Sequence, residues 1–377
     1  MAKSSSGGGK IAFFSGDITR SGGTERVGTL IANALAARGH YEIFMVSLTE
    51  SGSGTAFGLS GQIGRSAFSD HWILPGPGYV PVIFQLKRYV KRHGIDVLVD
   101  IDGVLDVLSL PVKWMTGVRV ISWEHFNFYE NMGTSYRHTI RRLAARFADA
   151  IVTLTEMDRQ FYLDNLNIRH EICAIHNPAD YLPGMEKPVR PFEKKRLLSV
   201  GALRCRKGFR RVPLIAKLLK ERYTSDFIWY IAGEGEERAA IEANVRRFGV
   251  EEQVKLLGHV SDVGPLYEHA LVYVMTSECE GLPMVLLEAK NFSLPAVSFD
   301  IRTGPSEIIE DGVGGCLIPV SGDDERDAQA MADAIGGLLT DEVRYRSFEA
   351  HAKDHMERFS MEQIAARWEE LLARVLR

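Results

Sequence analysis

The feature that most constrains the fold of this 377-residue chain is a regular alternation of short apolar runs with stretches of helical periodicity. In the first half, the runs that predict strands are Ile11–Ser15, Glu42–Leu48, Asp96–Ile101, Arg119–Trp123, Ala150–Leu154 and Ile172–His176. Most of them are nearly continuous in apolar residues, as strands covered on both faces are. A helical stretch, Glu25–Arg38, stops before Gly39, a residue type that commonly ends helices. Strands that alternate with helices predict α/β units with parallel sheets.

A single proline-rich break separates two halves of this alternation. Residues 177–196 contain four prolines among charged residues, which predicts a linker between domains. After the break, further runs predict strands at Arg196–Gly201, Phe227–Ala232, Val254–Leu257, Leu271–Thr276, Ala296–Phe299 and Cys316–Ile318. Apolar positions at helical spacing over residues 361–376 predict a final helix.

The two halves predict an α/β chain of two Rossmann-like domains that face each other across a cleft, because 377 residues exceed one ordinary core. The predicted organisation is a flexible N-terminus over 1–9, a first domain over 10–180, a linker over 181–195, a second domain over 196–358, and a C-terminal helix over 359–377 that packs back toward the first domain. Ligands of open α/β sheets bind beyond the carboxyl ends of the strands, so site residues are expected there.

Composition narrows the class of protein. A formal net charge of −4 gives no general reason to expect nucleic-acid binding. The four cysteines have no metal-ligand spacing, which favours reduced thiols over a disulfide framework: they are Cys173, Cys205, Cys279 and Cys316. The first ten residues lack the apolar core of a signal peptide, and no run of about 18 apolar residues occurs. The expected location is therefore the cytoplasm.

The segment richest in chemistry, residues 277–289, follows the strand predicted to end at Thr276. Pro283 suits the first turn of a helix, which places Glu280 in the preceding loop and Glu288 on the helix. If the whole span were helical, the two carboxylates would be roughly 12 Å apart. That separation is too large for a shared proton, but it fits the two ends of an elongated ligand.

A nucleotide sugar is such a ligand. Carboxylate oxygens accept hydrogen bonds from vicinal diols, and this ligand has diols on its ribose and on its sugar with a diphosphate between them. The helix N-terminus between the two glutamates offers free N–H groups and a favourable dipole to that diphosphate. The alternative is an unrelated pair, one acid at the start of a helix and one on the surface.

The same segment resembles a motif of a known enzyme family. Glu280 to Ala289 reads E-G-L-P-M-V-L-L-E-A, which is similar to the E-x7-E motif of glycosyltransferase family 4, the retaining enzymes of the GT-B fold. Further matches follow in the family's order at Gly22–Val27, Val200–Phe209, Ala232–Gly235, Leu257–Val260 and Gly304–Gly312. Each match alone is weak, but the ordered set covers nearly the whole chain. The resemblance implies a GT-B glycosyltransferase.

The resemblance also implies a role for each matching residue on the donor side. Glu288 would bind the donor ribose and Glu280 the transferred sugar. Lys207 would neutralise the diphosphate leaving group, a role that needs no metal ion, and no cofactor is expected beyond the nucleotide-sugar donor itself. The remaining implied donor-binding positions are Gly281, Leu282, Met284 and Val285 for the phosphates and sugar, and Gly258 and Val260 near the base.

One position departs from the family pattern. Members often have an arginine two residues after the strand valine, where this chain has Ala202. Either Arg204 or Arg206 would supply the missing charge, or a helix N-terminus would suffice. For Arg206 and its neighbours Arg210 and Arg211, the alternative is an exposed basic loop.

The acceptor side is expected on the first domain. His125 follows a predicted strand and matches a family histidine near the reacting sugar, which implies a positioning role or a transition-state contact. A general base is not required, because in retaining GT-B enzymes the departing phosphate oxygen accepts the acceptor's proton. Gly22 and Gly23 either let the backbone approach a ligand closely or form a tight turn before a helix. Residues 100–102 imitate a metal-binding D-x-D, but are better explained as a loop after a strand.

Two basic clusters have two interpretations. The clusters are Lys87, Arg88, Lys91 and Arg92, and, at helical spacing, Arg137, Arg141, Arg142 and Arg146. They are either solvated faces or a surface that meets anionic lipid headgroups or a lipid-diphosphate acceptor.

The residues and the resemblance together predict retaining transfer of a hexose or N-acetylhexosamine from a UDP-sugar to a saccharide acceptor. The acceptor is expected to be lipid-linked, as in the assembly of surface polysaccharides or glycans. The enzyme is then expected at the inner face of a membrane. One alternative is a UDP-sugar epimerase of the same two-domain shape. The other is a two-lobed sugar-binding module of the periplasmic type, which would need an export signal. That module also leaves Lys207, Glu280 and Glu288 unexplained.

Overall fold

The structure is a computed structural model that describes residues 8–52, 54–73, 75–131, 136–179 and 188–377. The chain forms two compact units. Unit 1 consists of Met1–Pro178 together with Phe359–Arg377, and unit 2 consists of Ala179–Arg358. Most of the predicted flexible N-terminus (residues 1–7) and half of the predicted linker (residues 181–187) lie outside the described residues.

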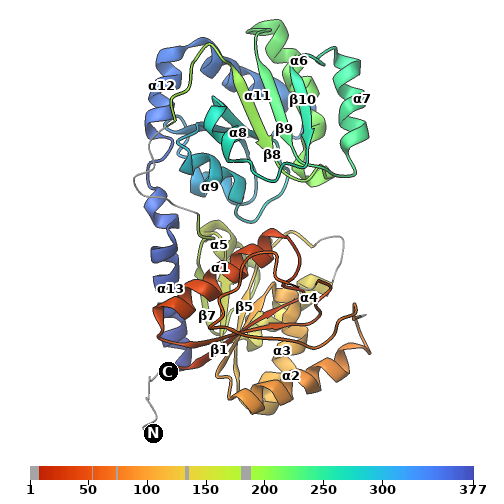
Figure 1. The fold of residues 1–377 in the computed structure, drawn as a ribbon, viewed down its shortest axis with the longest axis vertical. Coiled ribbons are helices and arrows are strands. Elements are labelled where there is room, and N and C mark those ends of the chain that lie inside the picture. The colour runs from red at the N-terminus through yellow and green to blue at the C-terminus, as the bar shows by residue number, and fades with distance from the viewer. Residues whose placement is uncertain (1–7, 53, 74, 132–135, 180–187) are drawn as a thin grey trace. The chain divides into compact units, whose positions relative to one another are not determined.

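Unit 1 is built on a seven-stranded parallel sheet with the order β3-β2-β1-β4-β5-β6-β7 (Figure 1). Its strands are β1 (Lys10–Ser15), β2 (Glu42–Ser47), β3 (Gly64–Ala67), β4 (Val97–Ile101), β5 (Arg119–Trp123), β6 (Ala150–Thr153) and β7 (Glu171–Ala174). Its helices are α1 (Gly23–Arg38), α2 (Tyr79–His93), the short η1 (Gly103–Leu105), α3 (Asp106–Thr116), α4 (Tyr136–Phe147), α5 (Glu156–Asn165) and α13 (Met361–Leu376). Helix α1 packs on α13, whereas α2, α3 and α4 pack side by side in a separate layer.

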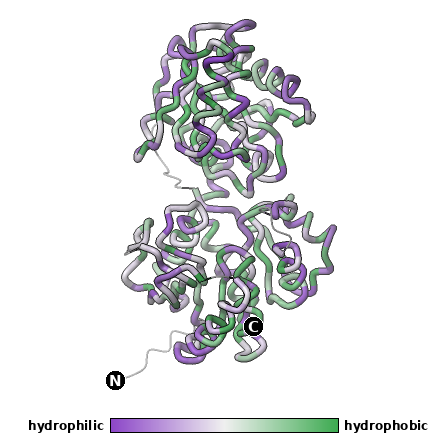
Figure 2. The backbone as a smooth tube through the Cα atoms, turned by 90° about the vertical axis from the view of Figure 1, so that its right-hand side faces the viewer, coloured by the Kyte–Doolittle hydropathy of each residue, from purple (hydrophilic) through white to green (hydrophobic). Residues whose placement is uncertain are grey.

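The core of unit 1 joins the beginning of the chain to residues near its end. The central strand β1 is buried from Ile11 to Ser15, because helices cover both faces of the sheet. Trp368 of α13 is fully buried and packs edge-on against Trp123 and Phe13, with ring centroids 4.7 and 6.2 Å away. Figure 2 shows the hydrophobic stretches running through each unit and many hydrophilic stretches on its outside.

Unit 2 is built on a six-stranded parallel sheet with the order β10-β9-β8-β11-β12-β13. Its strands are β8 (Arg196–Val200), β9 (Ile228–Ala232), β10 (Val254–Gly258), β11 (Val272–Met275), β12 (Ala296–Asp300) and β13 (Gly315–Pro319). Its helices are η2 (Cys205–Lys207), η3 (Phe209–Arg211), α6 (Val212–Arg222), α7 (Arg238–Phe248), α8 (Gly264–His269), α9 (Met284–Asn291), α10 (Pro305–Ile308), α11 (Asp324–Thr340) and α12 (Glu342–His351), followed by η4 (Met356–Phe359), which leads back to unit 1.

The predicted fold class, an α/β chain with two Rossmann-like domains, is confirmed. Every predicted strand overlaps an observed one, and the predicted final helix coincides with α13. Gly39 ends α1 in the left-handed conformation, as its position indicated. The strand β3 is absent from the predictions because residues 64–67 contain no apolar run; it is a short edge strand that pairs only with β2.

Among the residues that the structure describes, every helix is too short or too polar to span a bilayer.

Candidate functional site

The carboxyl ends of β8 and β11 lie next to each other in the middle of the unit 2 sheet. These strands are neighbours although β9 and β10 come between them in sequence. Such a switch point is where open α/β sheets bind ligands. The loop after β8 contains residues 201–211 and the loop after β11 contains residues 276–283, and both segments hold residues that the sequence assigned to the donor site.

Close backbone contacts join these two loops. Gly208 has a φ of 66°, and a Cβ there would lie 2.0 Å from the carbonyl oxygen of Thr276. The Thr276 hydroxyl donates to the Lys207 carbonyl over 3.0 Å, and the Glu278 N–H donates to the Arg206 carbonyl over 2.8 Å. Any side chain at residue 208 would therefore push the loops apart.

Lys207 and Glu280 meet where the loops join. The Lys207 Nζ lies 2.6 Å from Glu280 Oε1, and both side chains are largely buried. A hydrogen bond between two charged groups in such surroundings is stronger than a neutral one. The sequence predicted both residues as part of a site, but not that they touch. Together they place a cation and a carboxylate at the switch point of the sheet.

The loop after β12 supports the backbone that follows Glu280. The Thr303 hydroxyl donates to the Gly281 carbonyl over 2.8 Å and to the Glu280 carbonyl over 3.3 Å. Gly304 has a φ of 103°, and a Cβ there would lie 2.5 Å from Cδ of Pro283. The Gly304–Gly312 match of the sequence thus begins at a residue that packs on the turn after Glu280 and fixes its path.

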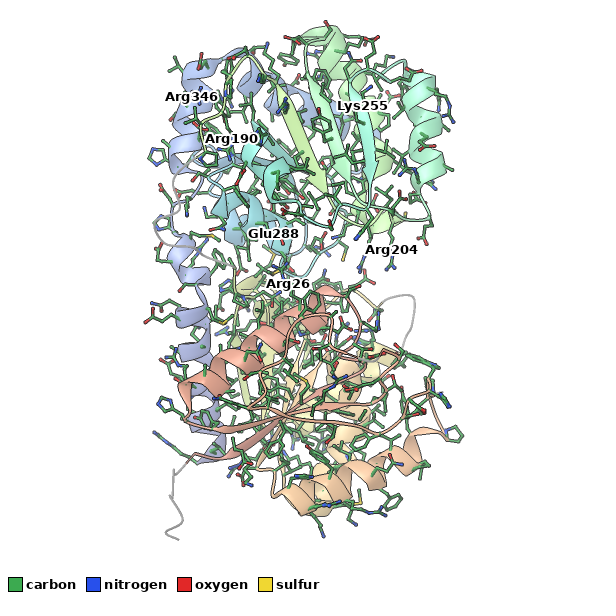
Figure 3. The ribbon with its side chains drawn as sticks, in the orientation of Figure 1. Arg26, Arg190, Arg204, Lys255, Glu288 and Arg346 are labelled. Carbon is green, nitrogen blue, oxygen red and sulfur yellow. The ribbon has the colours of Figure 1, made fainter. Side chains whose placement is uncertain are left out.

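Glu288 lies on α9 and is oriented by a tyrosine of α8. The Tyr267 hydroxyl donates to Glu288 Oε2 over 2.9 Å. The Tyr267 ring is buried and stacks between Tyr273 and Phe292, with centroids 5.7 and 5.5 Å away. Because the stack holds the hydroxyl in place, the Glu288 carboxylate is oriented before any ligand binds. Figure 3 shows Glu288 and Arg204 at the same edge of unit 2.

The first turn of α9 belongs to the same loop. Within the described residues, the N–H groups of Met284 and Val285 donate to no protein acceptor, as expected for the start of a helix. Pro283 immediately precedes the helix, with a ψ of 105°, so its predicted place in the first turn is wrong by one residue. Only the second half of the span from Glu280 to Glu288 is helical, and the separation expected for a continuous helix does not apply.

Three of the four arginines in the loop after β8, namely Arg204, Arg210 and Arg211, fall into two groups. Arg210 forms an ion pair with Glu237, and Arg211 forms one with Asp324 at 2.8 Å, so both tie the loop to neighbouring helices. Arg204, in contrast, is exposed, and within the described part of the chain its guanidinium has no hydrogen-bond or ion-pair partner. Among the described residues, Arg204 is thus the one of these three arginines whose charge is not paired within unit 2.

The two residues predicted to lie near the base are further along the same edge. Gly258 ends β10, and its carbonyl accepts a hydrogen bond from the Gly233 N–H over 2.8 Å. Val260 follows in the next loop and is partly buried. Since β9 separates β10 from β8, these residues lie to one side of the Lys207–Glu280 pair rather than against it.

Unit 1 has its own switch point, between β1 and β4. Gly22 caps α1. A Cβ on Gly23 would meet no heavy atom within 4 Å, whereas a Cβ on Gly22 would lie 2.2 Å from the Glu25 carboxylate, so the start of α1 is open at Gly23. After β4, Asp102 has a φ of 83°, which is unusual for a residue with a side chain. Its two carboxylate oxygens accept hydrogen bonds from Arg137 over 3.1 and 2.9 Å. A strained backbone that is held by a bidentate ion pair is a feature found at functional sites.

His125 lies in the loop after β5 and is only 7% exposed. Its ring packs 4.5 Å from that of Trp123. Among the described residues, its Nε2 atom is buried without a hydrogen-bond partner. Burial lowers the pKa of His125 to about 4, although the Asp102 carboxylate acts in the opposite direction. The imidazole is therefore neutral at pH 7, where it can donate one hydrogen bond and accept one but is a weak base.

A buried arginine supports the loop that carries His125 from the interior of unit 1. Arg141 of α4 is 1% exposed. Its guanidinium donates to the Phe128 carbonyl over 2.8 Å, to the Glu130 carbonyl over 2.9 Å, and to Glu124 Oε2 over 3.3 Å. These bonds satisfy the carbonyls of an irregular loop and pair a buried carboxylate, so Arg141 fixes the loop from inside the unit.

The basic cluster predicted on α4 is therefore not one surface. Arg137 and Arg141 are both buried, the first paired with Asp102 and the second with Glu124. The interpretation of these two residues as a lipid-facing surface is wrong, because helical spacing turns them toward the interior of unit 1. Arg142 and Arg146 of the same cluster are exposed.

The carboxylates of residues 100–102 have different surroundings. Asp102 faces Arg137, whereas Asp100 is fully buried and accepts a hydrogen bond from Ser109 over 2.6 Å. Burial raises the pKa of Asp100 to about 6, and burial with the neighbouring Asp100 charge raises the pKa of Asp106 well above its usual range. In the described part of the chain, no three His, Cys, Asp or Glu side chains are grouped so that they could hold a metal ion.

Two family models match the chain one after the other. Residues 21–181 match the model described as Glycosyltransferase Family 4, and residues 185–355 match the model described as Glycosyl transferases group 1. The chain is a glycosyltransferase.

Relatives of this glycosyltransferase extend over its whole length. An uncharacterized glycosyltransferase of Haemophilus influenzae is 28% identical over 363 residues, which are 96% of this chain and 99% of that protein. The amylovoran biosynthesis glycosyltransferase AmsD of Erwinia amylovora is 26% identical over 371 residues, 96% of this chain and 99% of that protein. The Campylobacter jejuni GalNAc-alpha-(1->4)-GalNAc-alpha-(1->3)-diNAcBac-PP-undecaprenol alpha-1,4-N-acetyl-D-galactosaminyltransferase is 27% identical over 375 residues, 97% of this chain and 99% of that protein. The relatives thus include enzymes of polysaccharide and glycan assembly.

Solved structures share the fold of the glycosyltransferase. Sucrose-phosphate synthase from Thermosynechococcus elongatus superposes with a TM-score of 0.81 at 18% identity, covering 97% of this chain and 99% of that one. Anabaena HepE in complex with UDP superposes with a TM-score of 0.75 at 18% identity, covering 97% of this chain and all of that one. At such identities the likeness establishes the fold, which is GT-B.

The structure gathers most of the predicted donor-side residues of the glycosyltransferase at one edge of unit 2. They are Lys207, Arg204, Glu280, Gly281, Leu282, Met284, Val285 and Glu288. Sequence reasoning missed two supporting residues. Tyr267 has the pattern of an ordinary core residue, and nothing in the sequence indicates its bond to Glu288. Thr303 adjoins the Gly304 motif, and its position beside that motif was a usable signal.

Proposed function

We propose that the protein is a retaining glycosyltransferase of surface-polysaccharide or glycan biosynthesis. It transfers a hexose or N-acetylhexosamine from a UDP-sugar to a lipid-linked saccharide acceptor. The donor proposal is supported by the UDP that HepE, a protein of the same fold, holds in its structure. The acceptor proposal is supported by the name of the Campylobacter relative, which specifies an undecaprenol-diphosphate-linked saccharide. Because a lipid-linked acceptor is held in a membrane, we propose that the enzyme acts at an anionic membrane surface.

The observation that carries the proposal is the 2.6 Å contact of Lys207 with Glu280 at the switch point of unit 2. In the proposed complex, the diphosphate lies beside Lys207 and Arg204, which stabilise the charge that develops on the leaving group. Glu280 accepts hydrogen bonds from the sugar hydroxyls, and Glu288, already oriented by Tyr267, binds the ribose diol. The free amides of the first turn of α9 meet the phosphates, so no metal ion is required.

The transfer itself exchanges one bond at the anomeric carbon for another. The bond from that carbon to the β-phosphate oxygen breaks, and a bond to the acceptor oxygen forms on the same face. The proton of the acceptor hydroxyl moves to the departing phosphate oxygen, so UDP leaves with it. His125 contributes as a neutral hydrogen-bonding group that orients the sugar or the acceptor, because an imidazole with a pKa of about 4 is a poor base at neutral pH. The start of α1 at Gly22 and Gly23, which is open at Gly23, is the proposed acceptor-side loop.

The test compares two ion pairs of unit 2. The variants Lys207→Ala and Glu280→Ala remove the proposed site pair, while Lys217→Ala and Glu221→Ala remove an exposed pair on α6. Donor binding is measured with UDP-sugars by calorimetry, and transfer or donor hydrolysis is measured by chromatography. We expect both site variants to lose transfer by about 100-fold or more and both control variants to retain it. Full activity of both site variants contradicts the assignment.

Two further measurements define the chemistry. Incubation of the protein with a UDP-sugar but no acceptor, followed by NMR of the sugar, distinguishes transfer from epimerisation, since an epimerase converts the donor alone. A panel of nucleotide sugars screened by thermal shift identifies the donor, because a ligand that binds only the folded state raises its melting temperature. The anomeric configuration of the product then tests retention.

A further inference from the structure

One helical layer of unit 1 has a charge that contrasts with the rest of the chain. The whole sequence has 45 Lys and Arg against 49 Asp and Glu. Helices α2, α3 and α4 contain four, one and four Lys or Arg residues, and only one acidic residue, Asp106, which is fully buried. These three helices pack side by side on one face of the sheet (Figure 1). The outer side of this layer is therefore basic in a protein that is acidic overall.

The exposed cations of the layer lack carboxylate partners. Arg137 and Arg141 point inward, and Lys113 of α3 is paired with Asp149 at 2.8 Å. Within the described residues, none of the remaining cations forms an ion pair, and all of them are exposed except the partly buried Lys87: they are Lys87, Arg88, Lys91 and Arg92 on α2 and Arg142 and Arg146 on α4. Unpaired charges of one sign on one surface attract a partner of the opposite sign.

The same layer exposes large apolar side chains. Phe84 on α2 is 54% exposed, and Val80 one turn before it is exposed as well. Trp114 on α3 is 62% exposed. Aromatic and aliphatic side chains next to basic ones are the composition of helices that lie in the interface of a bilayer. A surface that only met solvent or a polyanion would gain nothing from them.

A cavity at the α4 end of the layer adds a site for an anion. Its volume is about 280 Å³, and its charged lining residues are Arg142, Arg146 and Arg169, accompanied by Asn165 and Asn167. In the described part of the chain, none of the three guanidinium groups has a carboxylate partner, and no acidic residue lines the cavity. Guanidinium groups and amide N–H groups are the donors that phosphate oxygens require.

We propose that the outer face of the α2–α3–α4 layer binds an anionic lipid bilayer and that the Arg142–Arg146–Arg169 cavity takes the phosphate of a lipid headgroup. Val80, Phe84 and Trp114 enter the interface, while the basic residues meet the headgroups. The proposal rests on the proposed function in one respect, which is that a lipid-linked acceptor would be located at the bilayer surface. It does not depend on the donor site, which belongs to unit 2.

The first experiment measures sedimentation of the full chain with vesicles. We expect binding to phosphatidylglycerol-containing vesicles and little binding to pure phosphatidylcholine. The variant Arg142→Glu/Arg146→Glu should weaken that binding by more than about tenfold. The matched control, Arg246→Glu/Arg326→Glu, reverses the same number of charges at exposed arginines of unit 2 and should bind as the wild type does. Equal binding to both vesicle types, or unchanged binding of the cavity variant, overturns the proposal.

A second experiment tests the apolar contact. On addition of phosphatidylglycerol vesicles, tryptophan fluorescence should shift to the blue, and Trp114→Ser/Phe84→Ser should reduce both the shift and the binding that survives high salt. Binding to single-stranded RNA with no vesicle binding would instead assign the face to nucleic acid and overturn the proposal. UDP-induced thermal stabilisation, recorded for each variant, separates this result from a failure of the proposed function, because surface variants should retain it.

Discussion

The two units have sheets with corresponding strand orders, but they stabilise the loops at the carboxyl ends of those sheets in different ways. In unit 2, close backbone contacts join the loops in addition to the partly buried Lys207–Glu280 pair: the backbone of Gly208 packs on Thr276, and the Thr303 hydroxyl donates to the carbonyl of Gly281. In unit 1, buried ion pairs hold the loops, with Arg141 bound to Glu124 and Arg137 bound to Asp102. Glycine and short polar residues leave a readable sequence motif, whereas a buried arginine looks the same in sequence as one on the surface. The comparison therefore explains why one site was easier to predict than the other.

The largest expected effect is that of removing the buried arginine of unit 1. Arg141→Met leaves the buried Glu124 carboxyl without its ion-pair partner and two loop carbonyls without the donors that Arg141 supplies, so we expect a loss of about 3–5 kcal/mol in the free energy of unfolding. The neighbouring Arg142→Met should change it by less than about 0.5 kcal/mol, because Arg142 is exposed. Urea denaturation measures both. Equal effects of the two substitutions would mean that buried ion pairs do not hold the unit 1 loops.

The corresponding change in unit 2 acts on a backbone contact. Gly208→Ala adds a Cβ 2.0 Å from the Thr276 carbonyl oxygen in a left-handed conformation, so we expect a loss of about 3 kcal/mol and weaker UDP binding. Gly249→Ala is the matched control, since Gly249 has a φ of 64° but open space around it, and it should cost only about 1–2 kcal/mol. Calorimetry with UDP and thermal unfolding distinguish the two. A Gly208 variant that binds UDP normally would remove the loop contact from the site.

The lowered pKa of His125 makes the free energy of unfolding depend on pH in a direction that can be stated in advance. Its pKa is about 4 in the folded protein and about 6.5 when unfolded, so the stability it contributes is present above pH 6.5 and is lost as pH falls toward 4. The wild type should lose up to about 3 kcal/mol more than His125→Gln between pH 7 and pH 4. Asp100, whose pKa is raised, acts in the opposite direction, because it makes the folded protein more stable as pH falls. This effect is present in both proteins, so the difference between their stability curves reports the histidine alone. Parallel stability curves would show that His125 is not buried in neutral form.

The smallest expected effect belongs to the tyrosine that orients Glu288. Tyr267→Phe keeps the ring stack but removes the 2.9 Å hydrogen bond, so we expect UDP affinity to fall by about 1.5 kcal/mol, or roughly tenfold. Tyr223→Phe removes a similar bond to Asp333 on the outside of unit 2 and should leave UDP binding unchanged. An equal loss in both variants would indicate a general effect on unit 2 rather than orientation of Glu288.

The sequence predicted most of the fold because the central strands of parallel sheets are continuous apolar runs, which are easily recognised. It did not predict β3, since residues 64–67 contain no apolar run, and their place in the sheet depends on pairing with β2 and on the ion pair of Arg65 with Glu50. For the site, motif residues such as Lys207 and Glu280 were predicted, but their contact depends on which strands are neighbours. The roles of Arg141 and Tyr267 depend on tertiary packing alone, because neither a helical arginine nor a core tyrosine indicates its partner in sequence.

The position of α13 has a consequence for how the protein is made. Trp368 lies in the core of unit 1 against Phe13 and Trp123, and Trp123 in turn contacts His125. During translation, the strands of unit 1 emerge first, but a part of their hydrophobic core arrives only after all of unit 2 has been synthesised. Unit 2 can thus complete its fold on the ribosome while unit 1 still awaits Trp368. Until residues 361–376 are made, the packing behind His125 is unfinished, so the loop that carries His125 is among the last parts of the enzyme to mature.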